Sequence, residues 1–268
     1  MVDSTAATEL LELALHSARS AATLALKGWR TQPQSTQKGR ADLVTQFDLD
    51  SEALLRQELS RCSSFPVVGE ERGGERPGSP LTPVWYVDPI DGTTNFVHGH
   101  PFWCVSVGLA QDGRPVLGAV VAPSLGLEWT GIAGDSARRN GQVCRVSEVA
   151  EFQDALLATG FPYDRHTNPD NNFDAFVAIK KKCQAVRRCG SAAIDLCFVA
   201  DGTYDGYWEQ KVKAWDVAGG SAIVQAGGGR VSDYTGRVHD VTGGFVVATN
   251  GRIHEKLIQE LGEARRGY

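Results

Sequence analysis

A series of short apolar segments separated by tight turns constrains the fold of this chain more than any other feature. From Phe65 to about residue 148 the apolar residues recur with the period of an extended chain. Turn pairs such as Asp112-Gly113 and Asn140-Gly141 separate several of the segments. The segments are FPVVGEE, VWYVDPIDG, WCVSVGLA, PVLGAVVA, LEWTGIA and VCRVSE. We therefore predict a sheet built largely of sequential antiparallel strands.

Helical patterns lie on both sides of this region. Before it, an amphipathic helix is predicted over about the first 27 residues, ended near Gly28, and leucines between residues 54 and 59 indicate a second helix. The polar residues 31 to 41 between them are interpreted as a mobile loop, in which neither Lys38 nor Arg40 is assigned a role. Beyond residue 150, helical segments alternate with strands. Helices at both ends of a sheet-rich middle predict layered α and β elements.

Composition and charge restrict the class of protein. With 42% hydrophobic and 22% charged residues, a chain of 268 residues can bury a large core, as one domain or as two joined ones. The net charge of -5 comes from intermixed signs, so we expect no nucleic-acid partner. The start of the chain has no signal-peptide pattern and no later stretch could span a membrane, so a cytoplasmic location is expected by default.

The cysteines and two histidines are interpreted as structural. None of the cysteines stands in a CxxC pair or at a metal-finger spacing, so we expect reduced, buried thiols of an intracellular protein. His98 and His100 lack further nitrogen or sulfur ligands at a suitable spacing, and we interpret them as structural or surface residues. The cysteines are Cys62, Cys104, Cys144, Cys183, Cys189 and Cys197.

The segment WYVDPIDGTTNF places two acids at a rigid corner. Pro89 restricts Asp88 to an extended conformation, and Gly92 permits a sharp exit after Asp91. Two carboxylates aimed at one point repel each other unless a proton or a cation lies between them. Oxygen ligands of this kind favour a hard ion such as Mg²⁺. The alternative is an ordinary turn, because Asp, Pro and Gly are the usual turn formers.

Two further acidic segments stand at predicted element boundaries. Glu70 and Glu71 follow a short apolar run, where burial of unpaired charge is costly. Asp216 follows Trp215 at the start of a helical pattern of small residues, where it could instead be only the helix N-cap. Three acidic corners together favour a shared site over three unrelated turns.

With these three segments the sequence resembles the inositol monophosphatase family, the lithium-sensitive, Mg²⁺-dependent phosphatases. The family pattern is a Glu-Glu pair, then Asp-Pro-Ile/Leu-Asp-Gly/Ser-Thr, then Trp-Asp followed by eleven residues and Gly-Gly. The resemblance runs from about Asp42 to Gly229 and also reaches CGSAAIDLC and Glu209. In this chain the pattern reads Glu70-Glu71, Asp88-Pro89-Ile90-Asp91-Gly92-Thr93, Trp215-Asp216 and Gly228-Gly229.

The resemblance implies the fold and a metal cluster. The expected fold is a layered αβαβα sandwich of the α+β class. Residues 1-150 would form an N-terminal domain with a large, mainly antiparallel sheet that carries the GEE and DPIDGTT motifs. Residues 151-268 would form a C-terminal α/β domain. Two to three Mg²⁺ ions are implied, with Mn²⁺ as a possible substitute and Li⁺ as an inhibitor.

The implied ligands are assigned position by position. Glu70, Asp88 and the Ile90 carbonyl would hold a first ion, while Asp88, Asp91 and Asp216 would hold a second. Glu70 with waters would hold a weaker third ion.

Roles in catalysis and substrate binding are also implied. Thr93, with Asp48 behind it, would orient the attacking water, and Glu70 would help to take its proton. The backbone N–H groups of Gly92 and Thr93 can point at phosphate. The residues expected to meet the polyol or line its pocket wall are Asp91, Gly190, Ser191, Ala192, Glu209 and Asp216.

Two substrate-side assignments stay open at this point. Glu209 precedes Asp216 by seven residues, as in inositol-type members, but it could be an exposed surface residue. Lys211 and Lys213 could serve a second anionic group of the substrate or be solvated surface charges.

The leading hypothesis is Mg²⁺-dependent hydrolysis of a polyol phosphate monoester, with myo-inositol monophosphate as the expected substrate. The alternative within the superfamily is a phosphatase for histidinol phosphate, fructose bisphosphate or a nucleotide 3'-phosphate. A third hypothesis is a non-enzymatic partner of the transcription machinery, which the intact ligand set and the lack of a basic patch disfavour. A homodimer is expected by analogy with the family.

Overall fold

The computed structural model of this protein describes residues 4–39, 42–74 and 79–265. Within that part of the chain, the strands form a seven-stranded sheet, a five-stranded sheet and a two-stranded hairpin. Strands of the seven-stranded sheet are neighbours in chain order; β3 and β4 pair in parallel, and each later pair is antiparallel. They are β3 (Val67–Gly69), β4 (Val84–Asp91), β5 (Cys104–Gln111), β6 (Arg114–Ala122), β7 (Leu127–Ile132), β8 (Ala137–Arg139) and β9 (Gln142–Cys144). The predicted sequential antiparallel sheet is confirmed.

The five-stranded sheet has mixed pairing. Its order is β11-β10-β12-β14-β13, in which β10 pairs in parallel with β11 and β12, while β12 and β13 pair antiparallel with β14. Its strands are β10 (Leu156–Thr159), β11 (Ala185–Arg187), β12 (Gly206–Gln210), β13 (Arg230–Ser232) and β14 (Phe245–Thr249).

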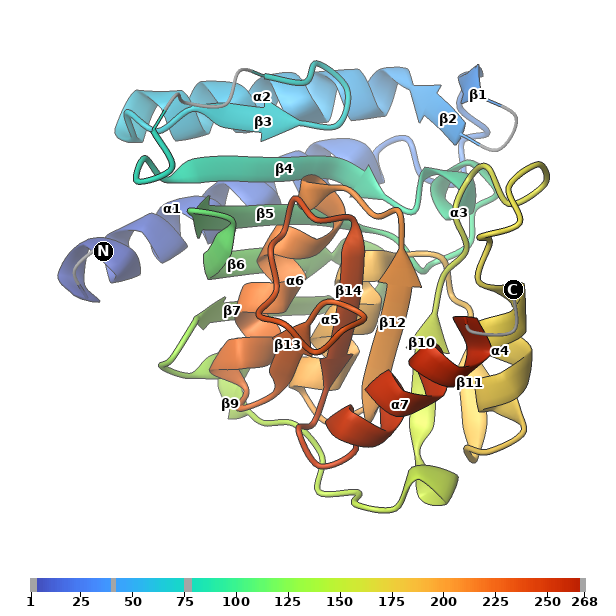
Figure 1. Ribbon diagram of the computed structural model, residues 1–268. Coiled ribbons are helices and arrows are strands. Elements are labelled where there is room, and N and C mark those ends of the chain that lie inside the picture. Colours follow the sequence, from blue (N-terminus) through green and yellow to red (C-terminus); the bar gives the residue numbers. More distant parts are fainter. Residues whose placement is uncertain (1–3, 40–41, 75–78, 266–268) are drawn as a thin grey trace.

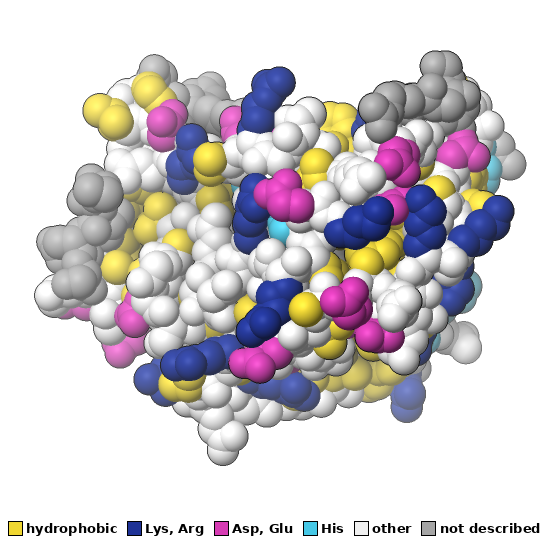
Figure 2. Space-filling view, turned by 60° about the horizontal axis from the view of Figure 1, so that its bottom comes forward, with side chains coloured by type: hydrophobic (Ala, Val, Ile, Leu, Met, Phe, Trp, Pro, Cys, Tyr) yellow, Lys and Arg dark blue, Asp and Glu magenta, His cyan; other side chains and the backbone are white. Residues whose placement is uncertain are grey.

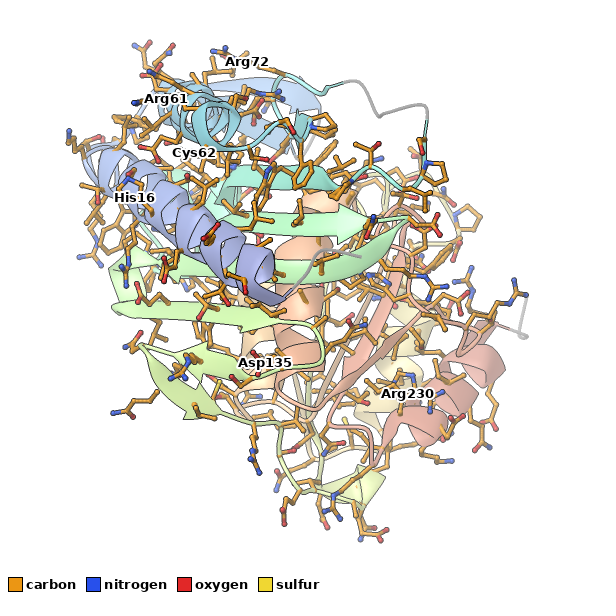
Figure 3. The ribbon with its side chains drawn as sticks, turned by 90° about the vertical axis from the view of Figure 1, so that its left-hand side faces the viewer. His16, Arg61, Cys62, Arg72, Asp135 and Arg230 are labelled. Atoms are coloured by element: carbon orange, nitrogen blue, oxygen red, sulfur yellow. The ribbon has the colours of Figure 1, made fainter. Side chains whose placement is uncertain are left out.

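Helices separate and cover the two sheets (Figure 1). The first pair, α1 (Ser4–Leu26) and α2 (Gln46–Cys62), lies on the outer face of the seven-stranded sheet, and Figure 3 shows α1 crossing that face with His16 on its surface. A second pair, α5 (Ala192–Ala200) and α6 (Ala214–Ala226), lies between the sheets. The last pair, α4 (Phe173–Lys180) and α7 (His254–Arg265), covers the five-stranded sheet. The predicted αβαβα layering is confirmed.

Strand β4 leads into the region of the predicted site and is buried along its whole length. Trp85 and Val87 pack into the core beneath α1 and α2, whereas Val84 and Tyr86 pack into the core around α5 and α6. This alternation follows from the two-residue period of a strand that is covered on both faces. The short helix α3 (Thr93–Val97) follows β4 directly, and 3₁₀ turns occupy Pro123–Leu125 and Phe152–Asp154.

Helix α6 approaches the seven-stranded sheet closely enough for backbone to meet backbone at Gly219. A Cβ atom added to Gly118 of β6 would lie 2.2 Å from the carbonyl oxygen of Gly219 in α6. A Cβ atom on Gly108 of β5 would lie 2.4 Å from the Gly219 amide nitrogen. Glycine at these positions therefore sets how close the helix that carries Asp216 comes to the sheet.

Replacement of Gly118 with alanine is expected to lower the free energy of unfolding by about 2 kcal/mol, because the new methyl group forces α6 away from β6. Thermal unfolding followed by circular dichroism measures the effect. Gly262→Ala in α7 is the control. Apart from its chain neighbours and the backbone of its own helix, no atom of the described residues lies within 4 Å of the added Cβ, and alanine there should stabilise by up to about 1 kcal/mol. Equal stability of Gly118→Ala and wild type would contradict the close packing.

The expectation that residues 31 to 41 form a mobile loop is corrected. Residues 31 to 41 do not form only a loop, because Ser35–Gly39 is strand β1, paired antiparallel with β2 (Asp42–Thr45). Residues 35 to 37 of this strand are exposed, so it lacks the apolar alternation that identifies a strand, and Arg40 lies outside the described residues.

The cysteines are free thiols, but most are not buried. Cys104 and Cys197 are buried, whereas Cys62 is exposed at the end of α2 (Figure 3) and the other three are half-buried. Cys62 is the last residue of α2, and the side chain at a helix end is not enclosed by the core.

Candidate active site

A pocket of about 620 Å³ opens where β4, α5, α6 and β12 meet. Each of the three acidic sequence segments contributes to its lining through Glu70, Asp88, Asp91 or Asp216, whereas Glu71 is not among the lining residues. The lining includes Glu70 after β3, Asp88, Ile90 and Asp91 in β4, Gly92 and Thr93 after β4, Gly190, Ser191 and Ala192 at the start of α5, Glu209 in β12, and Asp216 in α6.

A β-bulge turns both aspartates of β4 toward the pocket. Asp88 lies opposite Ser106 of β5 and Asp91 lies opposite Cys104, so three steps along β4 match two steps along β5. In a regular strand, residues three apart point to opposite faces, and the extra residue cancels that alternation. The Ile90 N–H donates to Asp88 Oδ1 at 3.0 Å, and Gly92 leaves the strand with φ 98°. The rigid corner predicted from the sequence is therefore a bulge followed by a left-handed residue.

Thr93 and Asp48 meet at the floor of the site. Thr93 Oγ1 lies 3.2 Å from Asp48 Oδ1 and 3.0 Å from the Ile90 carbonyl oxygen. Asp48 is held in turn by the capping box of α2, because its Oδ2 accepts the Thr45 N–H at 2.8 Å. Asp48 and Thr93 are both buried, so their contact is shielded from water.

Asp91 and Asp216 are each tied to the start of a helix. Asp91 Oδ2 accepts the Ser191 hydroxyl at 2.6 Å and the Ala193 N–H at 2.7 Å, at the N-terminus of α5. Asp216 is the third residue of α6 rather than its N-cap, and its Oδ2 accepts the Lys213 N–H at 2.7 Å. Exposed N–H groups at helix starts favour negative charge, so both positions suit a carboxylate.

Burial raises the pKa of three carboxyl groups of the pocket, and neighbouring acids add to the effect at Asp88 and Asp216. Burial first, and then the charges of Glu70, Asp91, Asp216 and Asp48, raise the pKa of Asp88 well above its ordinary value. Burial also raises the pKa of Asp216 well above its ordinary value, and that of Asp91 to about 6 against the hydrogen bonds from Ser191 and Ala193. Such mutual repulsion is relieved when a cation neutralises the group.

The side chains are near one another without forming a finished metal cage. Among residues 4–39, 42–74 and 79–265, no three Asp, Glu, His or Cys side chains already stand close enough to enclose an ion. The hydrogen bonds described above engage Oδ1 of Asp88 and Oδ2 of Asp91 and of Asp216. The donor chemistry, carboxylate oxygens and one carbonyl, fits a hard divalent cation that keeps several waters.

Glu209 lies inside the pocket and is not an exposed surface residue. Its carboxylate accepts the Tyr207 hydroxyl, and burial raises its pKa to about 7. The two lysines beyond it also line the pocket. Lys211 Nζ pairs with Asp164 Oδ2 at 2.8 Å, whereas Lys213 contributes its backbone N–H to Asp216. The cation of Lys211 is therefore already paired.

Asp195 is a pocket residue that the sequence interpretation missed. It lies in the first turn of α5, is 2% exposed and lines the pocket. Its Oδ1 has no hydrogen-bond partner within the described part of the chain. Burial, followed by the charges of Glu209 and Asp91, raises its pKa well above the ordinary value. The helical spacing of four from Ser191 is the signal that could have identified it.

Comparison with known proteins identifies the family of the chain. Residues 6–266 match the sequence profile described as "Inositol monophosphatase family". The chain belongs to the inositol monophosphatase family. As a member, it is a phosphatase, an enzyme that hydrolyses phosphate esters. No helix in the described ranges of this family member has the length and hydropathy required to cross a lipid bilayer.

Relatives in the inositol monophosphatase family include proteins named as phosphatases and proteins named as Nus factors. An "Inositol-1-monophosphatase" from Synechocystis is 40% identical over 94% of this chain and 88% of its own length. A "Nus factor SuhB" from Pasteurella multocida is 35% identical over 94% of this chain and 95% of its own length. The solved inositol monophosphatase of Anabaena superposes with a TM-score of 0.87 at 35% identity and covers 96% of both chains.

Proposed function

We propose that this phosphatase hydrolyses a polyol phosphate monoester, with myo-inositol monophosphate as the preferred substrate, in a Mg²⁺-dependent reaction. The observation that carries the proposal is the convergence of Glu70, Asp88, Asp91 and Asp216 in one pocket from three distant parts of the chain. Glu209 in the same pocket supports a substrate that is rich in hydroxyl groups.

The proposed ligand set follows the acids of the pocket. Glu70, Asp88 and the Ile90 carbonyl would hold one Mg²⁺, Asp88, Asp91 and Asp216 a second, and Glu70 a weaker third; Mn²⁺ is a possible substitute. Bound divalent cations would neutralise the phosphoryl oxygens, acidify the attacking water and stabilise the leaving alkoxide. The raised pKa of Asp88 and Asp216 supports cation binding, since a cation lowers the cost of holding these carboxylates charged.

The chain's own residues position the water and the phosphate. The Thr93 hydroxyl donates toward Asp48 or the Ile90 carbonyl, which leaves its lone pairs to accept a hydrogen bond from the attacking water. Glu70 lines the same pocket and would help to take the proton of that water. The N–H groups of Gly92 and Thr93, at the start of α3, are available to hold the phosphoryl oxygens.

The opposite side of the pocket would bind the alcohol part. Gly190, Ser191 and Ala192 form the wall at the start of α5. Asp91, the Ala192 backbone, Glu209 and Asp216 would accept or donate hydrogen bonds to the polyol hydroxyls. A site that pairs with several hydroxyl groups discriminates strongly against esters without them, because its buried polar groups are then left unpaired.

Phosphate release from a panel of esters tests the proposal. The panel contains myo-inositol 1-phosphate, histidinol phosphate, fructose 1,6-bisphosphate and a nucleotide 3'-phosphate, each assayed with Mg²⁺, with Mn²⁺ and with a chelator. We expect the highest kcat/KM with inositol phosphate, loss of activity in chelator and inhibition by Li⁺. A higher kcat/KM for another ester of the panel would make that ester the preferred substrate.

A homodimer is also proposed, and light scattering of the purified protein would test it.

Glu209→Gln is expected to lower kcat/KM for inositol 1-phosphate by about 10- to 100-fold, since hydrogen bonds to a charged acceptor contribute about 1.5–3 kcal/mol. For phenyl phosphate, which has no polyol hydroxyls, we expect a change of less than about twofold because the metal ligands are unaffected. Glu151→Gln, an exposed acid outside the pocket, is the control. Equal losses on both esters would argue against a role of Glu209 in specificity.

The name Nus factor, carried by several relatives, suggests a second candidate role as a partner of the transcription machinery. On the face shown in Figure 2, Lys and Arg side chains are interspersed with Asp and Glu, so that face carries no continuous basic patch for nucleic acid. Capture of RNA polymerase by the purified protein would support this role. If the protein also had no phosphatase activity, the result would support a role in transcription in place of the proposed hydrolysis.

A further inference from the structure

The turn that carries Glu70 is built around a buried carboxylate from α2. The turn runs from Gly69 to Gly73 and is closed by the Gly69 N–H, which donates to the Gly73 carbonyl at 2.9 Å. Glu52 Oε2 accepts the Glu71 N–H at 2.6 Å, and Oε1 accepts the Arg72 N–H at 3.1 Å. Successive backbone N–H groups that converge in this way form a seat for an anion, and here the anion is the side chain of Glu52.

Arg56 joins this carboxylate to both ends of the turn. Its Nε donates to Glu52 Oε1 at 2.8 Å, its Nη1 donates to the Val67 carbonyl at 2.8 Å, and its Nη2 donates to the Gly73 carbonyl. Val67 precedes the turn and Gly73 ends it, so one guanidinium ties the incoming strand to the outgoing chain. The planar fork of arginine is suited to such simultaneous contacts, which lysine could not make.

The space beside the turn leaves no room for a side chain before Glu70. A Cβ atom added to Gly69 would lie 2.5 Å from Glu52 Cδ and 2.7 Å from each of its oxygens. Glu52 is fully buried, so its carboxylate has nowhere to retreat without losing its partners. The glycine of the GEE motif is therefore required by the contact with Glu52.

The same face of α2 also supports the other end of the site. Asp48, Glu52 and Arg56 are spaced four residues apart and lie on one face of the helix. Asp48 contacts Thr93 at one end, and Glu52 with Arg56 holds the Glu70 turn at the other. In Figure 1, α2 runs beside β3 and β4. Figure 3 shows Arg61, in the last turn of α2, and Arg72, in the Glu70 turn, at the same upper edge of the molecule.

We propose that Glu52 and Arg56 are positioning residues, which hold the Glu70 turn in the geometry that binds the divalent cations. The inference rests on the proposed metal-dependent function. Neither residue lines the pocket, so each acts through the backbone beside Glu70. Residues that orient metal ligands in this way change metal affinity by about 10- to 100-fold when they are replaced.

Glu52→Gln is the main test. An amide presents one oxygen and one NH₂ group, so in either orientation a donor faces the Glu71 N–H or the Arg56 guanidinium. The dissociation constant for Mn²⁺, measured by calorimetry without substrate, is expected to rise about 10- to 100-fold. Excess Mn²⁺ should restore kcat, a rescue that a protein with a generally damaged fold would not show.

Control and second variants keep the inference falsifiable. Asp50→Asn, an exposed acid on the same helix, should bind Mn²⁺ as wild type does. Gly69→Ala should displace the turn through steric contact with Glu52 alone. Arg56→Lys keeps the positive charge but loses the several N–H donors of the guanidinium. These two variants test the inference if Glu52→Gln does not fold. Folded variants at Glu52, Arg56 and Gly69 with wild-type Mn²⁺ affinity would overturn the inference. Wild-type protein that binds no Mn²⁺ would instead refute the proposed function.

Discussion

Replacing Asp88 with asparagine is expected to lower kcat for inositol 1-phosphate by about 10³-fold or more. Asp88 is the one side chain proposed to contact both of the more tightly held cations. The charge stabilisation that a metal ion supplies amounts to several kcal/mol, and each 1.36 kcal/mol is tenfold in rate. The substitution keeps the size of the side chain, and its remaining oxygen can still accept the Ile90 N–H. Steady-state phosphate release at saturating Mg²⁺ measures the loss.

When no metal is present, Asp88→Asn is expected to be more stable than the wild-type protein, although it is less active. Burial and four neighbouring acids raise the pKa of Asp88, so the folded protein binds its proton more tightly than the unfolded chain does. The stability that this proton contributes is complete below the ordinary pKa of an aspartate and is lost as the pH rises through the folded value. At neutral pH in chelator, Asp88→Asn should therefore have a higher Tm than wild type.

Mg²⁺ should reverse the order of the two Tm values, so that wild type becomes more stable than Asp88→Asn. Wild-type Tm is expected to rise with Mg²⁺ because the cation binds the folded state, whereas Asp88→Asn should respond weakly. Asp112→Asn is the control, since Asp112 is an exposed acid in a turn of the same sheet and asparagine tolerates its φ of 52°. A wild-type enzyme with the same Tm in Mg²⁺ and in chelator would speak against the proposed metal site.

The fold was predictable where the apolar pattern is strong. The predicted antiparallel order of the seven-stranded sheet follows from turn pairs such as Asp112-Gly113, in which both residues have positive φ. Strand β8 (Ala137–Arg139) was missed because its three residues, Ala-Arg-Arg, contain no apolar run and no alternation. Strand β1 was missed because its residues 35 to 37 are exposed, and the mixed pairing of the five-stranded sheet depends on contacts between residues distant in the chain.

The site was predictable where its chemistry is concentrated in short motifs. Asp88 and Asp91 stand three residues apart, but that they face the same side depends on a bulge whose partner strand is not visible in the motif itself. Glu52 and Arg56 were missed because nothing local distinguishes them from ordinary helix residues, and for Asp195 the only local signal is its spacing of four from Ser191. Their roles depend on partners outside the helix, such as the Glu71 N–H for Glu52 and the Val67 carbonyl for Arg56.

Replacing Thr93 with valine is expected to lower kcat by about 10²- to 10³-fold and to leave Mn²⁺ affinity nearly unchanged. Valine matches the shape of threonine but lacks the hydroxyl, so the attacking water loses its acceptor and Asp48 Oδ1 loses its partner. None of the proposed metal-ligating side chains is altered. The measurement pairs kcat for inositol 1-phosphate with calorimetric Mn²⁺ binding.

Thr93→Ser separates the hydroxyl from the methyl group. Serine keeps the oxygen that lies 3.2 Å from Asp48 Oδ1 and 3.0 Å from the Ile90 carbonyl, so kcat should stay within about tenfold of wild type. If valine retains the activity of serine, the hydroxyl does not orient the water. If valine instead weakens Mn²⁺ binding as strongly as it lowers kcat, then Thr93 supports the metal site through the Ile90 carbonyl, and the water must be held by another group such as Glu70.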